Sequence, residues 1–178
     1  MKIRVGAHDE REACVELWLG ALKARDGREQ NHIVAERAWA KFDQPLVRFA
    51  VAGVDPIGFA LTTDSGGDSE GRVAVLELLA VRPSETGRGI GRMLVEDSIR
   101  SAAELGFSGV ELHVRAGNAP AERLYRASGF KPKGEPFPHP LGGQPMIAYR
   151  LGLGSRSEAD CGNAPSGIHL HSRVRKTK

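Results

Sequence analysis

The sequence predicts one domain of the α/β (α+β) class, in which a mixed, mostly antiparallel sheet is flanked by helices on both faces. Segments whose apolar residues recur at helical spacing stand among short apolar runs typical of strands, in the order β-α-α-β-β-β-α-β-α-β, with a further strand at the end left open. The chain of 178 residues is 40% hydrophobic and 26% charged, which is the size and composition of one globular domain.

Turn and cap residues predict most of the boundaries. Asp9 and Glu12 have the spacing of a capping box, so we expect them to open the first helix and Gly27 to end it. Cys14 belongs to the apolar stripe of that helix and is expected in the core. The expected elements are strands over residues 3–5, 46–52, 56–62, 73–81, 110–115 and 146–151, helices over 9–25, 32–42, 90–105 and 119–128, a loop over 64–71 and a proline-rich linker over 132–145.

Basic residues concentrate at the C-terminal end. From residue 152 onward five basic residues face two acidic ones, which accounts for the whole net charge of +3, so residues 1–151 balance to zero. We therefore expect a domain over 1–151, a basic disordered tail over 152–178 and no specific nucleic-acid partner. Without a signal peptide or a membrane-spanning stretch, the expected location is the cytoplasm, with no membrane contact. The spacing of cysteines and histidines suggests no metal site.

A glycine-rich turn stands between a predicted strand and a predicted helix. Gly87, Gly89 and Gly91 lie where successive backbone N–H groups can point into one concavity, at the positive end of the helix dipole. The turn therefore indicates a phosphate cradle, with Arg88 and Arg92 supplying charge beside it. A tight glycine turn without a ligand would have the same pattern.

The dinucleotide-binding fingerprint is an alternative reading of this turn, and it fits poorly. That fingerprint needs G-x-G-x-x-G after a first strand, with an acidic residue about 20 residues further on. Here the spacing is G-x-G-x-G, and the turn follows a fourth strand that a hairpin precedes. The position of the acidic residue is held in mid-strand by Glu111 or His113.

Two blocks of sequence resemble the GNAT superfamily of N-acetyltransferases. Residues 78–94, LLAVRPSETGRGIGRML, are similar to motif A, in which Arg or Gln is followed by two residues, Gly, one residue, and Gly or Ala. Residues 118–130, NAPAERLYRASGF, are similar to motif B, an Asn with a short helix containing Leu-Tyr and then Gly-Phe. The order and separation of the blocks match the family, so the resemblance implies its fold and acetyl-coenzyme A (acetyl-CoA) as acyl donor. Thr86 departs from the pattern, because its short side chain stands in place of Arg or Gln.

The resemblance implies a donor site built from the fourth strand, the glycine turn and motif B. The pantetheine arm would lie along the strand and bond to its backbone, while the turn amides would take the pyrophosphate. Asn118 would bond to the pantetheine arm, although it also has the position of an N-cap. The residues implied in donor binding are Leu79, Ala80, Val81, Thr86, Gly87, Arg88, Gly89, Ile90, Gly91, Arg92, Asn118 and Tyr125.

Tyr125 matches the family tyrosine that protonates the departing thiolate. A phenol with a pKa of about 10 is a suitable donor to the thiolate of a thiol with a pKa of about 8.5. Without the motif, Tyr125 would be interpreted as a core aromatic residue at helical spacing with Leu124 and Phe130.

Glu77 is the candidate base that takes the proton from the acceptor amine. A carboxylate that interrupts an otherwise apolar strand needs a reason, and by alternation it is expected to share a face with Val75 and Leu79. Glu111, His113 or water are alternative bases. Glu77 could instead meet water near a strand splay or pair with an arginine.

The sequence thus predicts an enzyme, an acetyl-CoA-dependent N-acetyltransferase that moves an acetyl group to a primary amine of a small molecule or peptide, without a metal. A non-catalytic module that binds or senses acyl-CoA is the alternative. Residues 22–42 and 134–145 are expected to shape the acceptor site, and their mixed charges favour no sign of substrate. Homodimer formation is left open.

Overall fold

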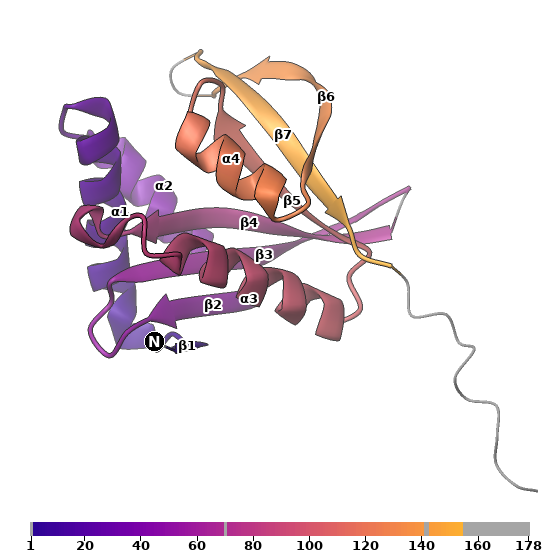
Figure 1. Cartoon of the computed structure of the whole chain (residues 1–178), viewed down its shortest axis with the longest axis horizontal. Helices are drawn as coiled ribbons and strands as arrows, with labels where there is room; N and C mark the ends of the chain where they lie inside the picture. The colour runs from indigo at the N-terminus through magenta and orange to yellow at the C-terminus, as the bar shows by residue number, and fades with distance from the viewer. Residues whose placement is uncertain (1, 70, 141–142, 155–178) are drawn as a thin grey trace, which may run out of the picture.

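A computed structural model describes residues 2–69, 71–140 and 143–154. Its seven strands form one sheet in the order β1-β2-β3-β4-β5-β7-β6, and every neighbouring pair is antiparallel except β4 and β5 (Figure 1). This confirms the predicted fold class. The elements are β1 (Ile3–Val5), α1 (Arg11–Asp26), α2 (His32–Lys41), β2 (Leu46–Ala52), β3 (Gly58–Asp68), β4 (Gly71–Val81), α3 (Ile90–Glu104), β5 (Gly109–Arg115), α4 (Ala119–Ala127), β6 (Lys131–Pro138) and β7 (Pro145–Gly152).

Helices cover both faces of the sheet. On one face, α1 and α2 bury Cys14 and an aromatic group in which Phe42 packs edge-on against Phe49, with ring centroids 5.2 Å apart. On the other face, α3 and α4 bury Leu94 and Tyr125. Burial raises the pKa of the Cys14 thiol to about 12, so this cysteine is an unreactive core residue, as predicted. No helix in the described part of the chain is long and apolar enough to cross a membrane.

The entry into α1 differs from the predicted capping box of Asp9 and Glu12. A 3-10 turn precedes the helix, and it is Glu10 that accepts a hydrogen bond, from the Ala7 N–H at 2.8 Å. Glu10 is held there because the Arg4 guanidinium donates to the same carboxylate oxygen at 2.6 Å. The predicted cap residues were wrong because a contact with β1, remote from the local pattern, selects the capping carboxylate. The left-handed residue Gly27 (φ 68°) ends α1, as predicted.

The segment predicted as a loop, residues 64–71, is largely strand. β3 continues to Asp68 and β4 begins at Gly71, with a register shift between Asp64 and Gly67. Arg72 in β4 donates to Asp64 at 3.0 Å and lies 4.3 Å from the centre of the Phe107 ring. The prediction of a loop was wrong because cross-strand pairing outweighs the weak strand propensity of polar and glycine residues.

The segment predicted as a proline-rich linker contains β6, which pairs with β7 at the edge of the sheet. Proline lacks a backbone N–H, and an edge strand has one side that needs no ladder, so β6 tolerates its prolines. The prediction of a linker was therefore wrong for residues 132–138. It failed because prolines are found both in linkers and in edge strands, so proline content does not distinguish the two.

A buried ion pair joins α3 to β2 and has no signal in the sequence. Asp97 is only 2% exposed, and it accepts a hydrogen bond from Arg48 Nε at 2.6 Å. Arg100, one turn further along α3, contacts the same carboxylate. Together these contacts fix the helix over the sheet.

We expect Asp97→Ala to lower the free energy of unfolding by about 3 kcal/mol, because it leaves the Arg48 charge without its buried partner. Glu96→Ala, on the neighbouring residue of α3, is the matched control. Its ion pair with Arg92 is exposed, so the loss should stay within about 0.5 kcal/mol. Urea unfolding of both variants measures the difference, and equal losses would show that the buried pair adds no stability.

Candidate active site

The glycine turn connects β4 to α3 and presents a row of free backbone N–H groups. Gly87 and Gly89 adopt the left-handed conformation, with φ of 77° and 79°, which disfavours side chains there. Among the described residues, the amides from Gly87 to Arg92 donate no hydrogen bond, and the first amide of α3 that does is that of Met93, to Gly89 O at 3.1 Å. Six consecutive donors at the N-terminus of a 15-residue helix form a cradle for an anion.

The side chains of the turn are occupied locally. Thr86 donates through its hydroxyl to Pro83 O at 2.9 Å. Arg88 pairs with Glu85, and Arg92 Nε lies 2.7 Å from Glu96 Oε1. The charge that is free to receive an anion is therefore that of the backbone, which fits the presence of a threonine in place of the longer side chain.

β4 has a free backbone edge beyond Leu76. The parallel ladder with β5 ends at the pair Leu76 and Leu112, and β4 and β5 then diverge (Figure 1). Within the described residues no strand pairs with this edge of β4 from Glu77 to Val81. Such an edge can accept an extended ligand as an added strand. The predicted positions Leu79, Ala80 and Val81 lie on this edge.

A β-bulge at Glu77 changes which face the neighbouring side chains occupy. Opposite β3 the register shifts between the pairs Leu61 with Leu78 and Thr62 with Leu76, so Glu77 is an extra residue. Leu79 consequently packs in the α3 cluster, whereas Glu77 contacts α2 on the opposite face. The expectation that Glu77 and Leu79 share a face was wrong, because alternation fails across a bulge.

Glu77 is paired with a lysine that the sequence did not single out. Lys41 Nζ lies 2.8 Å from Glu77 Oε2, and the Thr63 hydroxyl donates to Oε1 at 3.4 Å. Of the alternatives weighed for Glu77, pairing with an arginine comes nearest to what is found, but the cation is Lys41. Lys41 ends α2 and belongs to no motif, so only the tertiary structure reveals it.

The alternative bases on β5 are engaged with one another and with β6 and β7. Glu111 lies 3.1 Å from Lys133 Nζ, 3.7 Å from Arg150 Nη1 and 3.3 Å from His113 Nε2. The His113 ring meets Phe137 edge-on, with centroids 5.1 Å apart. Glu111 is therefore surrounded by cationic groups and lies one strand away from the free edge of β4.

Two residues of motif B have a side-chain polar group that makes no hydrogen bond within the part of the chain that the structure describes. Tyr125 is buried in α4 beside Phe130 and Tyr149, and its hydroxyl makes no hydrogen bond to the described residues. Burial raises the pKa of Tyr125 to about 12, so the phenol keeps its proton at neutral pH. Asn118 stands at the N-cap of α4, but its side chain makes no cap hydrogen bond. Its amide thus stays free for a ligand.

The part of the chain expected to shape the acceptor site reaches the face that carries Glu77. Asp26, at the end of α1, accepts from Arg115 Nη1 at 3.1 Å and from Arg25 Nε at 2.7 Å. These contacts, with Arg25 the larger, hold the pKa of Asp26 below its usual value. Burial, then the charges of Arg37 and Arg115, lower the pKa of His139.

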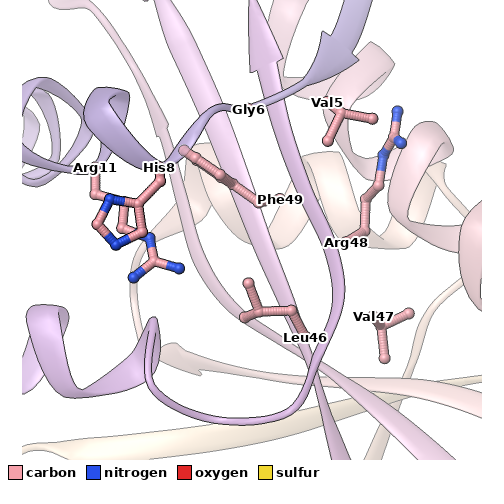
Figure 2. Close-up of a pocket in the computed structure, with 8 residues that line it drawn as sticks. All are labelled: Val5, Gly6, His8, Arg11, Leu46, Val47, Arg48 and Phe49. Atoms are coloured by element: carbon pink, nitrogen blue, oxygen red, sulfur yellow. The ribbon is translucent and has the colours of Figure 1, made fainter.

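A pocket with a cavity volume of 280 Å³ lies at the β1 and β2 edge and contains none of the predicted site residues (Figure 2). His8 and Arg11 both line this pocket, and Arg48 extends from β2 away from them. None of its lining residues belongs to the glycine turn, to β4 or to motif B. In the described residues no group of three or more His, Cys, Asp or Glu side chains could hold a metal ion.

Comparison with known proteins defines the class. Residues 11–130 match the model of the acetyltransferase (GNAT) family, so the chain belongs to that family, and the class of enzyme is that of the acetyltransferases. The match includes both motifs and confirms the resemblance that they carried.

Relatives and solved structures agree with this family. The chain is 30% identical to peptidyl-lysine N-acetyltransferase YjaB of Salmonella typhimurium over 138 residues, which are 75% of this chain and 86% of that protein. It is 34% identical to mycothiol acetyltransferase of Clavibacter sepedonicus over 92 residues, 47% of this chain, and spans only 30% of that relative. The structure of yncA from Salmonella typhimurium, described with acetyl-CoA as its cofactor, has a TM-score of 0.67 at 19% identity, covering 94% of this chain and 99% of that one.

The pKa of Tyr125 is open to direct measurement, because the chain has only two tyrosines. We expect the phenolate absorbance of the wild type minus that of Tyr125→Phe to appear with a midpoint near pH 12. A rapid pH jump separates this titration from alkaline unfolding. A midpoint near pH 10 would mean that the phenol is solvated and is not the buried acid described above.

Proposed function

We propose that this protein is an acetyl-CoA-dependent N-acetyltransferase that transfers an acetyl group to the primary amine of a small molecule or peptide. The observation that carries the proposal is the row of six free amides from Gly87 to Arg92, which follows the free edge of β4 after the short 3-10 helix Pro83–Glu85. A pyrophosphate bound to these amides would start an extended arm along that edge. The amide row and the free edge of β4, together the donor path, would then bind the two parts of one extended ligand, on a single strand-turn-helix unit.

The dimensions of this path suit the arm of coenzyme A. From Val81 back to Glu77 the strand covers roughly 13 Å at about 3.3 Å per residue. A pantetheine arm carries two amide groups that can bond to the backbone edge as a strand would. Asn118 offers a further amide from α4. The reactive thioester would then lie near Glu77, at the point where β4 and β5 separate.

The proposed reaction is direct attack by a neutral amine on the thioester carbonyl. Glu77 accepts the proton of the amine, directly or through water, and it must exchange its contact with Lys41 for one with the substrate. A C–N bond forms as the C–S bond breaks. Tyr125, the buried phenol, gives its proton to the leaving thiolate and is reprotonated from solvent.

The relatives support an amine as the acceptor, since one is named for peptidyl-lysine. The mycothiol acetyltransferase relatives are matched over only a part of their length, so their name does not identify the amine that this chain uses. A reaction that consumes acetyl-CoA also suits the cytoplasmic location expected from the sequence. The sensing alternative makes a different prediction: coenzyme A binds, but no amine releases thiol from acetyl-CoA.

We expect Tyr125→Phe to lower kcat at saturating acetyl-CoA by about 100-fold while the Kd for coenzyme A changes less than about twofold, because only the proton donor is lost. Tyr149→Phe, the neighbour in the same aromatic group, is the control and should keep most of its turnover. Thiol release with an amine panel and calorimetric binding measure the two quantities. Unchanged kcat in Tyr125→Phe would remove this residue from the reaction.

A pair of glycines at the two ends of α3 tests the amide cradle. Gly89 and Gly106 have φ of 79° and 78°, and a Cβ at either would meet nothing within 4 Å. Alanine at either position should therefore cost a similar free energy of unfolding, about 1 kcal/mol. We expect only Gly89→Ala to raise the Kd for coenzyme A, by about tenfold, because it disturbs the direction of the free amides. Equal Kd values for both variants would show that the anion does not bind at this turn.

A further inference from the structure

Lys41 holds its amine against the carboxylate that the proposed reaction uses. Its side chain is 29% exposed, that of Glu77 is 18% exposed, and the two charged groups are 2.8 Å apart. Lys41 is the last residue of α2, so its side chain reaches the sheet from the face opposite to α3. A primary amine is thus already in contact with the proposed base.

The position of Lys41 along the donor path is also suitable. The amide cradle lies beyond Val81, and the free edge of β4 begins at Glu77, at the other end of the path. A donor bound along this edge brings its thioester to the Glu77 end. Lys41 then lies beside the reactive carbon, without diffusion of a second molecule.

A second lysine on the same face provides an internal comparison. Lys133 Nζ lies 3.1 Å from Glu111 Oε2, and its side chain is 43% exposed. Both lysines contact a carboxylate, and Lys133 is the more exposed of the two. They differ in location, because Glu111 lies on β5 opposite Val75, inside the β4–β5 ladder, whereas Glu77 lies beyond the last pair of that ladder, Leu76 and Leu112.

Resting on the proposed function, we propose that Lys41 is an acetyl acceptor within its own chain. Glu77 takes a proton from the Lys41 ammonium and passes it to solvent, and the neutral Nζ then attacks the thioester carbonyl of acetyl-CoA. The new bond is an N–C amide bond and the bond that breaks is C–S. Glu77 accepts the second Nζ proton as the amide forms, and the leaving thiolate takes its proton from Tyr125, which is reprotonated from solvent. Each chain consumes one acetyl-CoA and releases one coenzyme A.

This modification removes the charge of Lys41 and with it the ion pair to Glu77. Because Lys41 and an external amine attack the same carbon, the two compete for the donor. An amine substrate is therefore expected to slow acetylation of Lys41.

The experiment incubates the full chain with acetyl-CoA and no external amine, and locates acetyl groups by peptide mass spectrometry over time. We expect Lys41 to gain about one acetyl group per chain at a rate independent of chain concentration, at least tenfold faster than Lys133 or than Lys23, an exposed lysine of α1 that pairs with Glu29. Lys41→Arg keeps a cation beside Glu77 and should lose this label, whereas Lys133→Arg should keep it. Tyr125→Phe should slow the labelling as much as it slows turnover, and urea-unfolded chain reports purely chemical acetylation.

The outcomes separate the two proposals. Similar labelling of Lys41, Lys133 and Lys23, or a rate proportional to chain concentration, would overturn the internal transfer. Turnover of external amines without acetyl on Lys41 would overturn it too, and would leave the proposed function standing with Lys41 as a partner that only orients Glu77. A chain that binds no coenzyme A would contradict the proposed function itself.

Discussion

The end of the β4–β5 ladder at Leu76 and Leu112 is the constraint on which the site depends. Buried backbone polar groups need partners, so a strand edge in the middle of a sheet is costly unless something pairs with it. Here the free edge ends at Val81, and the turn with six free amides follows after a short 3-10 helix, Pro83–Glu85. The free backbone groups of β4 and the free amides at the start of α3 therefore lie along one stretch of the chain. An extended anionic ligand could form hydrogen bonds to both.

The bulge at Glu77 places this carboxylate on the opposite face of β4 from Leu79 and Val81. Beyond it, Leu79 and Val81 pack toward α3, while Glu77 meets Lys41 on the α2 face. In the proposed reaction the donor is held from the α3 side and the amine arrives from the α2 side. The gap between β4 and β5 is where they meet, so one extra residue in one strand lets a carboxylate face the acceptor while its neighbours stay in the core.

The sequence predicts those elements whose pattern is local, and it fails where the structure depends on contacts between distant segments. The glycine turn, α3 and α4 carry their own periodicity, caps and turns, and the structure has them within one or two residues of the prediction. The strand character of residues 64–68 and 131–138 comes from pairing with β4 and β7, which no local window contains. Glu77 stood out because its charge interrupts an apolar run, but its partner Lys41 lies 36 positions earlier on a helix without a motif. The face of Glu77 depends on a bulge that alternation alone cannot reveal.

Burial of Tyr125 has two effects that have to be weighed together. A pKa raised to about 12 keeps the phenol protonated, but it also makes the phenol a weaker acid than in water. Proton transfer depends on the difference between the pKa values of donor and acceptor, and in the proposed reaction the thiolate would form in the same apolar surroundings, also deprived of water. Desolvation therefore raises the basicity of the thiolate along with the pKa of the phenol. The aromatic packing with Phe130 and Tyr149 is thus compatible with the role of acid, because it removes solvent from both partners of the transfer.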